Sequence, residues 1–354
     1  MSLFSKAPLS FLGVDIGDSS IKMVELVRKG KRIYLKNYAF SETKKDVKFT
    51  KIEDVAYLAK AIQKIHTDSK IISRRVTASL PTFAVFSSII TLSGVDPKNL
   101  HEAVLEEARK VIPLPLDEMK IDYKVITDSP TDKKNRNLRV FLTCSPRKIV
   151  RKYIDIFRQA GMELSSLETE TFSLVRSLVG NDKSTTMIVE IGANSTDISV
   201  VRESIPVLNR SLEICASTLT QALADSLGMT FQQAEQLKMD LSLSTRVAKD
   251  AAVSPDDFSG VIIKALSPII SEIKYLLDFY NSANAAPVEK IVLSGGGALL
   301  GGLPEYLSNQ LNLQVIIGDS FNRVLYPNEL RPIIHELGPS LAVAVGLALR
   351  EVEQ

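Results

Sequence analysis

Cysteine and histidine are scarce in this sequence, and neither sign of charge dominates it. The 354 residues include two cysteines and three histidines, and 43 basic against 41 acidic side chains leave a formal net charge of +2. Cys144 and Cys215 are far apart and form no C-x-x-C pair, so we expect buried free thiols in a reducing compartment. The histidines have no metal spacing and no concentrated basic face is evident, so zinc chemistry and nucleic-acid binding are not expected.

Long apolar runs are also lacking. Residues 1–8 contain no long apolar core and therefore do not resemble a signal peptide. The longest apolar stretch near the C-terminus, residues 341–349, is far below the ~20 residues that span a bilayer. A hydrophobic fraction of 45% is normal for a globular protein. We therefore expect a cytoplasmic protein, and its length suits two or three packed units.

Two strand–turn–strand units resemble each other. Expected strands at residues 11–16 and 187–192 each carry an acid near their end, followed by a glycine and then by small hydroxylated residues. A glycine permits a tight turn and close backbone approach, and successive N–H groups in such a turn form a nest for phosphate oxygens. Hydroxyl groups can add donors, a lysine can neutralise phosphate, and acids can hold the water shell of Mg²⁺. Two such turns facing one cleft would grip one ligand.

A third glycine-rich turn, residues 295–297, follows an expected strand at residues 290–294. The three turns together are more specific evidence for a nucleotide site than any one of them alone. The sequence contains no G-x-x-x-x-G-K-[ST] motif, and its glycines do not fit the dinucleotide-binding spacing G-x-G-x-x-G.

These turns resemble the motifs of the actin-like ATPase superfamily, which includes actin, Hsp70, hexokinase and FtsA. Its two phosphate motifs correspond to residues 13–22 and 190–197, its adenosine motif to residues 291–298, and its two connecting motifs to residues 168–174 and 338–346. The resemblance implies an α/β, actin-like (ribonuclease H-like) two-lobed nucleotide-binding fold with an inserted α+β (SHS2-type) subdomain. The units expected from it are residues 1–75 (first lobe), 76–162 (inserted module), 163–180 (connecting segment), 181–337 (second lobe) and 338–354 (a helix returning to the first lobe).

The same resemblance implies a site for ATP and Mg²⁺. The helix at residues 231–238 resembles the family's E-x-x-K helix, whose Glu and Lys contact ribose and adenine in relatives. The implied nucleotide-binding residues are Gly17, Ser19, Ser20, Lys22, Gly192, Asn194, Ser195, Thr196, Glu235, Lys238, Gly295, Gly296 and Gly297. The implied metal-binding acids are Asp15, Glu190 and Asp197, and the candidate catalytic acids are Glu170 and Glu190.

Within the superfamily the sequence is most similar to the type IV pilus assembly protein PilM family, over essentially the whole chain. The segments FLGVDIGDSSIKMVEL, LETETFSLV and IVLSGGGALLGGLPEYLSNQL carry this resemblance. It implies a cytoplasmic ATP-binding scaffold, associated with the inner membrane through partners, that docks the N-terminal peptide of a PilN-like membrane protein. In relatives the peptide groove lies between the inserted module and the first lobe, which suggests the strands near residues 85–90. Other platform proteins, motor ATPases and a second copy of the chain are further expected partners.

One departure from this pattern and two alternative functions are considered. The second phosphate motif begins with Glu190 where relatives usually have Asp, so we expect nucleotide binding with weak or absent turnover, although Glu170 matches the position that orients the attacking water. A small-molecule kinase of the same superfamily would need a base beside a substrate pocket. A filament-forming FtsA-like protein would end in a cationic amphipathic helix, which residues 349–354 do not resemble.

Overall fold

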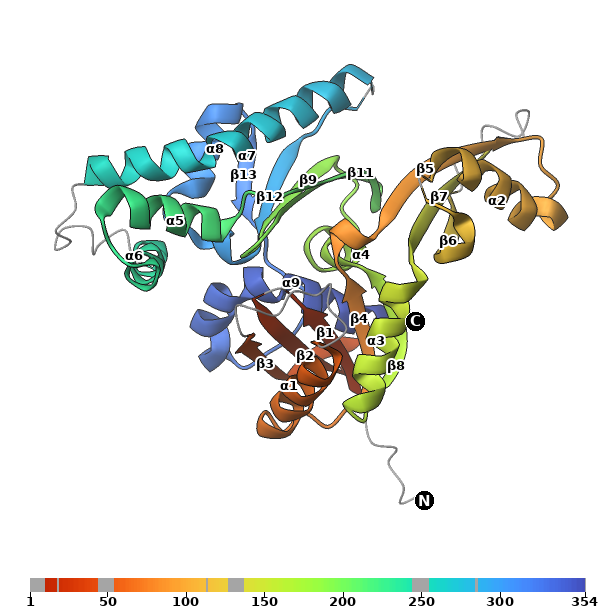
Figure 1. Ribbon diagram of the computed structural model, residues 1–354, viewed down its shortest axis with the longest axis horizontal. Coiled ribbons are helices and arrows are strands. Elements are labelled where there is room, and N and C mark those ends of the chain that lie inside the picture. The colour runs from red at the N-terminus through yellow and green to blue at the C-terminus, as the bar shows by residue number, and fades with distance from the viewer. Residues whose placement is uncertain are drawn as a thin grey trace.

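Two five-stranded sheets with the same strand arrangement form the centres of two lobes (Figure 1). The computed structural model describes residues 10–17, 19–43, 54–112, 114–126, 137–243, 255–283 and 286–353. Within them, the first sheet has the order β3-β2-β1-β4-β8 and the second the order β11-β10-β9-β12-β13. In each sheet an antiparallel meander comes first, and two later strands extend it in parallel beyond its first strand. The predicted repeat therefore extends beyond the turns to the whole sheet.

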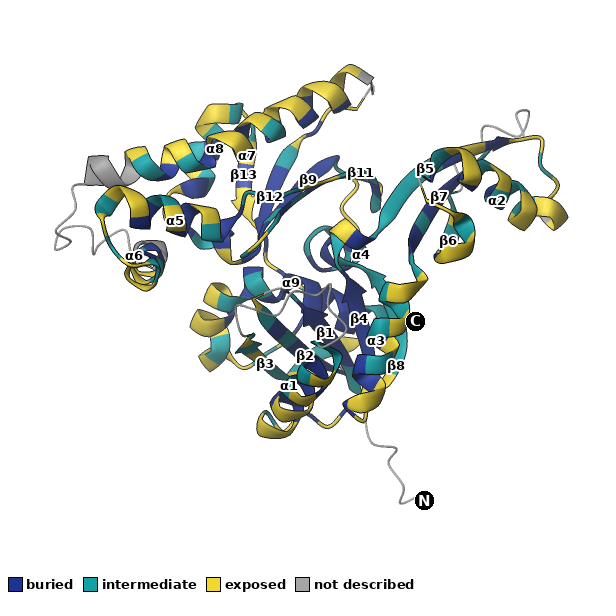
Figure 2. Cartoon of the chain, in the orientation of Figure 1, coloured by how far each residue is buried: buried dark blue, intermediate teal, exposed yellow. Residues whose placement is uncertain are grey.

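The strands of the first sheet are β1 (Ser10–Ile16), β2 (Ser20–Lys29), β3 (Arg32–Glu42), β4 (Arg75–Leu80) and β8 (Glu163–Thr169). Those of the second are β9 (Thr186–Ile191), β10 (Thr196–Arg202), β11 (Ile205–Leu212), β12 (Lys290–Ser294) and β13 (Gln314–Ile317). The strands β1, β4, β9 and β12 are almost entirely buried, as Figure 2 shows, because helices cover both faces of the sheets.

Helices of the first lobe bury one face of its sheet. The helices α1 (Asp54–Asp68) and α3 (Arg147–Gln159) place Leu58, Ile62, Tyr153 and Ile156 in one core with Val14 of β1. Because these apolar residues recur every three or four positions, each helix turns one stripe toward the sheet.

The second lobe is covered by α5 (Ala216–Leu227), α6 (Phe231–Leu243), α7 (Pro255–Ala283) and α8 (Leu303–Leu311). Leu219 and Leu223 of α5 and Ile273 of α7 pack with Val189 and Ile291 of the sheet. This core is separate from that of the first lobe, so each lobe has its own centre.

The helix α9 (Arg331–Glu353) joins the two lobes. Its Leu341 and Val345 pack against β2 of the first lobe, while other residues pack with β9 and β10 of the second. Two glycines permit the contact: a Cβ on Gly13 of β1 would lie 2.1 Å from the carbonyl oxygen of Ala344, and one on Gly346 would lie 2.0 Å from that of Ser173. Residues 328–352 are long and apolar enough to cross a membrane, yet 67% of the apolar window is buried in the protein, as for a core helix.

The inserted module is a three-stranded antiparallel sheet with the order β5-β7-β6. Its strands are β5 (Phe86–Ser93), β6 (Met119–Ile126) and β7 (Asn137–Pro146), and α2 (Leu100–Val111) covers one face. The module projects from the first lobe beside the second (Figure 1). The predicted range 76–162 was too wide, because β4 pairs with β1 and β8, and α3 packs on the first sheet.

Other predictions need correction or lie outside the described residues. The last helix was expected to begin near Pro339, but it begins at Arg331 and contains Pro339. The strands β8, β11 and β13 were not predicted. Asp18 of the first phosphate motif and residues 52–53 of the first predicted helix lie outside the described residues.

Candidate functional site

The β1–β2 and β9–β10 turns face each other across a cavity of about 80 Å³. They are closed by matching backbone hydrogen bonds: Gly17 N donates to Ser20 O over 3.0 Å, and Gly192 N donates to Ser195 O over 2.9 Å. Since the turns come from equivalent strands of the two sheets, the repeat brings one turn from each lobe to the same space. The predicted residues that line it are Asp15, Gly17, Ser19, Ser20, Lys22, Glu170, Glu190, Gly192, Asn194, Ser195 and Asp197.

Lys22 and Asp15 form an ion pair at the first turn. They are direct cross-strand partners in β1 and β2, and Lys22 Nζ lies 3.2 Å from Asp15 Oδ2. Ser79 Oγ at the end of β4 donates to Asp15 Oδ1 over 3.1 Å, which fixes the carboxylate from the other side. Burial lowers the pKa of Lys22, but the nearby carboxylates of Asp15, Glu190 and Glu170 outweigh it and raise that pKa overall. Lys22 therefore stays charged.

Glu170 reaches the cavity from α4 (Glu170–Leu174), a short helix between the lobes. Thr169 caps this helix by accepting a hydrogen bond from Phe172 N, which sets the direction of the first turn. Thr82 donates to Glu170 Oε2 twice, from its backbone N over 2.8 Å and from Oγ1 over 2.9 Å. The carboxyl group of Glu170 is therefore held by the short helical turn Thr82–Ala84 that follows β4.

Four acidic side chains share this small space. Glu190 and Asp197 are cross-strand partners in β9 and β10, and Asp15 and Glu170 face them from the first lobe. Burial and then repulsion by Asp197 raise the pKa of Glu190 to about 8, and burial followed by repulsion from Asp15 raises that of Glu170 well above its usual range. The cluster is short of positive charge, and a cation between the acids would favour their ionised forms.

The acidic side chains of the cavity suit a metal ion that is bound together with a phosphate group better than a metal ion bound by protein groups alone. In the described part of the chain, no three acidic, cysteine or histidine side chains converge closely enough to hold a metal by themselves. Mg²⁺ usually keeps several waters and binds one or two carboxylates together with phosphate oxygens. Asp15, Glu190 and Asp197 can therefore serve as acceptors for metal-bound water.

Glu235 and Lys238 lie behind the second turn and do not line the cavity. Ala216 N at the start of α5 donates to Gly192 O over 3.0 Å. Lys238 Nζ contacts Glu235 Oε2 at 2.7 Å, Thr220 Oγ1 at 2.8 Å and Ala216 O at 3.2 Å. The pair thus ties α6 to the first turn of α5, next to the β9–β10 turn.

The three consecutive glycines after β12 differ in their surroundings. Gly295 has φ +78°, and a Cβ there would lie 2.4 Å from Ile191 O, while one on Gly297 would lie 2.3 Å from the Ile191 side chain. These two glycines therefore let the chain cross the end of β9. Gly296 is exposed, with only Ser340 Oγ near its added Cβ, so it is the member of the triplet open to a ligand.

Not every predicted residue lines the cavity, and some residues at the cavity were not predicted. Thr196 is fully buried, and no partner for its Oγ1 is found among the described residues. Ser79, Thr82 and Phe83 lie at or near the cavity but were not predicted. Their only signal in the sequence was Pro81, which was interpreted as a break in one long strand.

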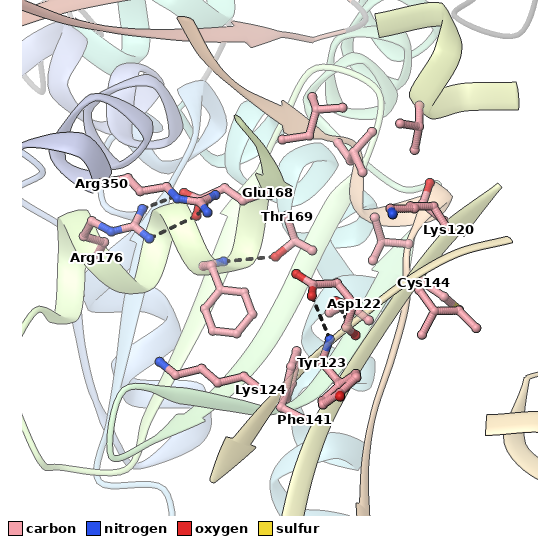
Figure 3. A pocket seen from close by; sticks show the side chains of 18 residues that line it. Lys120, Asp122, Tyr123, Lys124, Phe141, Cys144, Glu168, Thr169, Arg176 and Arg350 are labelled. Carbon is pink, nitrogen blue, oxygen red and sulfur yellow. Dashed lines mark hydrogen bonds and ion pairs between the residues drawn. The ribbon is translucent and has the colours of Figure 1, made fainter. Parts of the chain in front are cut away.

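A second, larger cavity of about 730 Å³ separates the inserted module from the first lobe. We call this cavity the groove. One of its walls is the face of the module's sheet that α2 does not cover, and it includes Asp122 and Phe141. Leu167 of β8 lies on the other wall. Figure 3 shows Arg176 and Arg350 meeting Glu168 at one end of this groove. Arg176 donates to both oxygens of Glu168, over 2.6 and 3.0 Å, and Arg350 donates over 3.3 Å.

The chain resembles known proteins over nearly its whole length. The model of the type IV pilus assembly protein PilM family matches residues 13–352. A solved PilM–PilN type IV pilus biogenesis complex contains a chain with TM-score 0.83 and 25% identity, with 98% of this chain and 100% of that chain covered.

Two further solved structures share the fold. The ethanolamine utilization protein EutJ from Carboxydothermus hydrogenoformans has TM-score 0.57 and 17% identity, covering 97% of this chain and 90% of that one. MreB 5 of Spiroplasma citri bound to AMPPNP has TM-score 0.55 and 13% identity, covering 97% and 96%. The actin-like fold predicted from the sequence is confirmed.

Proposed function

The chain belongs to the type IV pilus assembly protein PilM family, and on that basis we propose that it is a nucleotide-binding scaffold that docks a peptide of a PilN-like membrane protein. The observation that carries the proposal is the presence of two separate cavities, one between paired phosphate-gripping turns and one between the inserted module and the first lobe. We place the protein in the cytoplasm, held at the inner membrane through its partner.

We propose that the cleft takes ATP with Mg²⁺. Backbone N–H groups and hydroxyls of the two turns would donate to phosphate oxygens, and Lys22 would neutralise part of their charge. The metal would screen the phosphate charge, and Asp15, Glu190 and Asp197 would accept hydrogen bonds from its waters. Gly296 and the Glu235–Lys238 pair would lie toward the nucleoside. The nucleotide-bound MreB 5 structure supports this choice by sharing the fold.

We expect little hydrolysis. With a pKa of about 8, Glu190 carries a proton at neutral pH until a cation displaces it, and its side chain is one methylene longer than the usual Asp. Thr82 also occupies one oxygen of Glu170 with two hydrogen bonds, so that oxygen is engaged before any water arrives. Both features favour binding over turnover.

The groove would hold the partner peptide in an extended form. The strand β6 pairs only with β7 among the described strands, so its other edge is open, and residues 120–124 of β6 line the groove. An extended peptide can add to such an edge through backbone hydrogen bonds, while alternate side chains enter pockets. Of the strand expected at residues 85–90, only Val85 lines the groove.

Calorimetric titration of ATP and ADP, with and without Mg²⁺, tests the nucleotide part of the proposal. Mg²⁺–ATP should bind the protein, and Lys22→Ala should weaken binding at least about tenfold, since a charge-assisted contact contributes roughly 1.5–3 kcal/mol. Phosphate release should stay near the background of the Lys22→Ala protein. Steady turnover well above that background would contradict the scaffold, and turnover only with an added small-molecule acceptor would identify a kinase.

A further inference from the structure

The helix α3 carries a local excess of positive charge. Residues 147–159 include five basic side chains and one acidic side chain, an excess of four charges in a chain whose net charge is +2. The excess is larger than the net charge of the whole protein, so the rest of the chain has an acidic balance. The expectation that the protein has no concentrated basic face therefore needs correction at this helix.

The helix turns its basic residues outward. Tyr153 and Ile156 are fully buried in the core of the first lobe. Arg147, Arg151 and Arg158 are exposed on the opposite side, and their positions fall within about 40° of one another around the helix axis. Figure 1 shows α3 at the side of the first lobe, with the module above it. The three arginines form one row on the outer surface, which we call the arginine row.

Acidic side chains neutralise little of the charge on this surface. Arg158 forms an ion pair with Asp155 at 2.5 Å, one turn earlier on the same helix. Arg147 Nε donates to a backbone carbonyl oxygen over 2.9 Å and not to a carboxylate. Arg151 and the exposed Lys148 form no ion pair with any acidic side chain among the described residues. The middle of the row therefore offers unpaired positive charge to an anionic partner.

The arginine row begins at the groove. Arg147 Nε donates to Asp117 O in the turn Leu116–Glu118, which leads into β6. Val150 of α3 and Lys120 of β6 both line the groove. Under the proposed function the groove holds a peptide of a membrane protein. An occupied groove therefore keeps the adjoining outer surface of α3 close to the membrane.

The core already occupies the apolar side of α3, so a membrane would meet its basic side. Ile154 is the exception, since 45% of its surface is exposed, and it lies between Arg151 and Arg158 along the helix. Basic side chains near an anionic bilayer are attracted to its headgroups, and an exposed apolar side chain among them can enter the headgroup layer. Contact of this kind is shallow, electrostatic and sensitive to salt.

We propose that the outer face of α3, made of the arginine row, Lys148 and Ile154, lies against anionic phospholipid headgroups of the membrane that holds the partner. The inference rests on the proposed function, which brings this face to the membrane. A headgroup layer suits the face because it is a flat layer of negative charge that needs no matching pocket. The bound peptide also supplies the layer at high effective concentration. Peptide and headgroups are then two weak contacts that act together, as stable peripheral attachment requires.

Co-sedimentation with vesicles tests the contact in the absence of the peptide. Vesicles of phosphatidylglycerol and phosphatidylethanolamine should bind the protein, vesicles of phosphatidylcholine should not, and added NaCl should release it. The double variant Lys148→Ala with Arg151→Ala should lower the partition coefficient about thirtyfold, since each basic side chain at an anionic surface contributes roughly a fivefold factor. Arg147 stays unchanged because it holds the turn before β6.

The matched control removes two basic side chains elsewhere. Arg109→Ala with Lys110→Ala takes the same charge from exposed positions of α2, on the side of the module that faces away from the groove. This variant should bind anionic vesicles as the wild type does. Equal losses in the two double variants would show a response to net charge alone and would overturn the assignment to α3.

A fluorescent probe locates the contact on the surface. The chain contains no tryptophan, so Ile154→Trp introduces a single one into the proposed face. Its emission should shift to shorter wavelength when anionic vesicles are added. Tyr275→Trp, at an exposed position of α7 in the second lobe, should show no shift. A shift at residue 275 alone, or an equal shift at both positions, would place the contact elsewhere and overturn the proposal.

The possible results separate the lipid contact from the proposed function. A PilN-type peptide should bind the wild type and the Lys148→Ala, Arg151→Ala variant with the same Kd in calorimetry, because neither residue lines the groove. If the peptide binds and anionic vesicles do not, the lipid contact is overturned and the scaffold remains. If vesicles bind and the peptide does not, the proposed docking fails while the lipid contact stands. If polyglutamate but not the vesicles shifts the emission of Ile154→Trp, the face binds an acidic protein and the lipid assignment is overturned.

Discussion

At the residue scale, the chemistry of the cleft is set by acidic side chains that lie close enough to raise one another's pKa. Glu190 and Asp197 share a cross-strand position, and Asp15 and Glu170 approach from the first lobe. Lys22 is paired with Asp15, and Ser79 and Thr82 hold two of the carboxylates in place. The cleft therefore brings acidic groups close together, and a cation bound among them would relieve their mutual repulsion.

Glu190→Gln should stabilise the ligand-free protein at alkaline pH. The pKa of Glu190 is raised from 4.5 to about 8 in the folded protein, so between these values the folded state keeps a proton that the unfolded state has lost. The free energy of unfolding then falls as pH rises through this window. Gln does not titrate, so at pH 8.5 the variant should gain at least about 1 kcal/mol, roughly 2–4 °C in Tm.

Melting curves at pH 5.5 and pH 8.5 measure this difference. Glu163→Gln, at the exposed start of β8, serves as the matched control and should leave the pH dependence of Tm unchanged. An identical pH dependence for wild type and Glu190→Gln would show that Glu190 is ionised in the folded protein.

At the element scale, α9 is the part that holds the two lobes in one arrangement. Gly346 gives the helix an approach that no other residue permits, because an added Cβ there would lie 2.0 Å from the backbone of Ser173 in α4. Arg176 strengthens the same contact by donating to Gly346 O over 2.8 Å. The position of Glu170 in the cleft therefore depends on how closely α9 packs.

Gly346→Ala should destabilise the protein and weaken nucleotide binding together. Overpacking against backbone that cannot move aside typically costs about 1–3 kcal/mol. Gly260→Ala on α7 is the matched control, since nothing lies within 4 Å of an added Cβ there and Ala is the better helix former. Chemical denaturation should give a lower midpoint for Gly346→Ala and an equal or higher one for Gly260→Ala. Equal midpoints for wild type and Gly346→Ala would contradict the close contact.

The turns could be predicted from the sequence because their chemistry is local. An acid at a strand end, a glycine two residues later and hydroxyl groups after it occur within eight residues, as in Asp15 to Ser20. Glu235 and Lys238 were correctly paired on one helix face, but whether that face lies toward the cleft depends on how α6 packs on α5. Ser79 and Thr82 could not be found, since only the pairing of β4 with β1 and β8 brings Ser79 to Asp15 and Thr82 to Glu170.

The limits of the inserted module could not be predicted from the sequence for a similar reason. Residues 76–92 form an apolar stretch interrupted by Pro81, and periodicity does not indicate that the chain leaves one sheet there and enters another. The helix α3 also has an apolar stripe that fits either unit. The family resemblance supplied the order of the units, and only the strand pairing supplied their limits.

At the scale of the whole molecule, the duplicated lobes create one cleft and the insertion creates a second cavity beside it. The first lobe contributes to both, through residues 80–85 and 168–172. A protein of this form suits a scaffold, because a bound nucleotide fixes the lobes while the module presents an open strand edge to a partner.

The central claim, two separate binding sites for nucleotide and peptide, is tested most directly by amide hydrogen exchange with each ligand in turn. Mg²⁺–ATP should slow exchange at residues 17–20 and 192–195, and a PilN-type peptide should slow it along the open edge of β6, residues 119–125. Amide exchange on the faces of the lobes that point away from the two sites should not change. Peptide protection at β3 or β13 instead, or no protection of the two turns by nucleotide, would contradict the account.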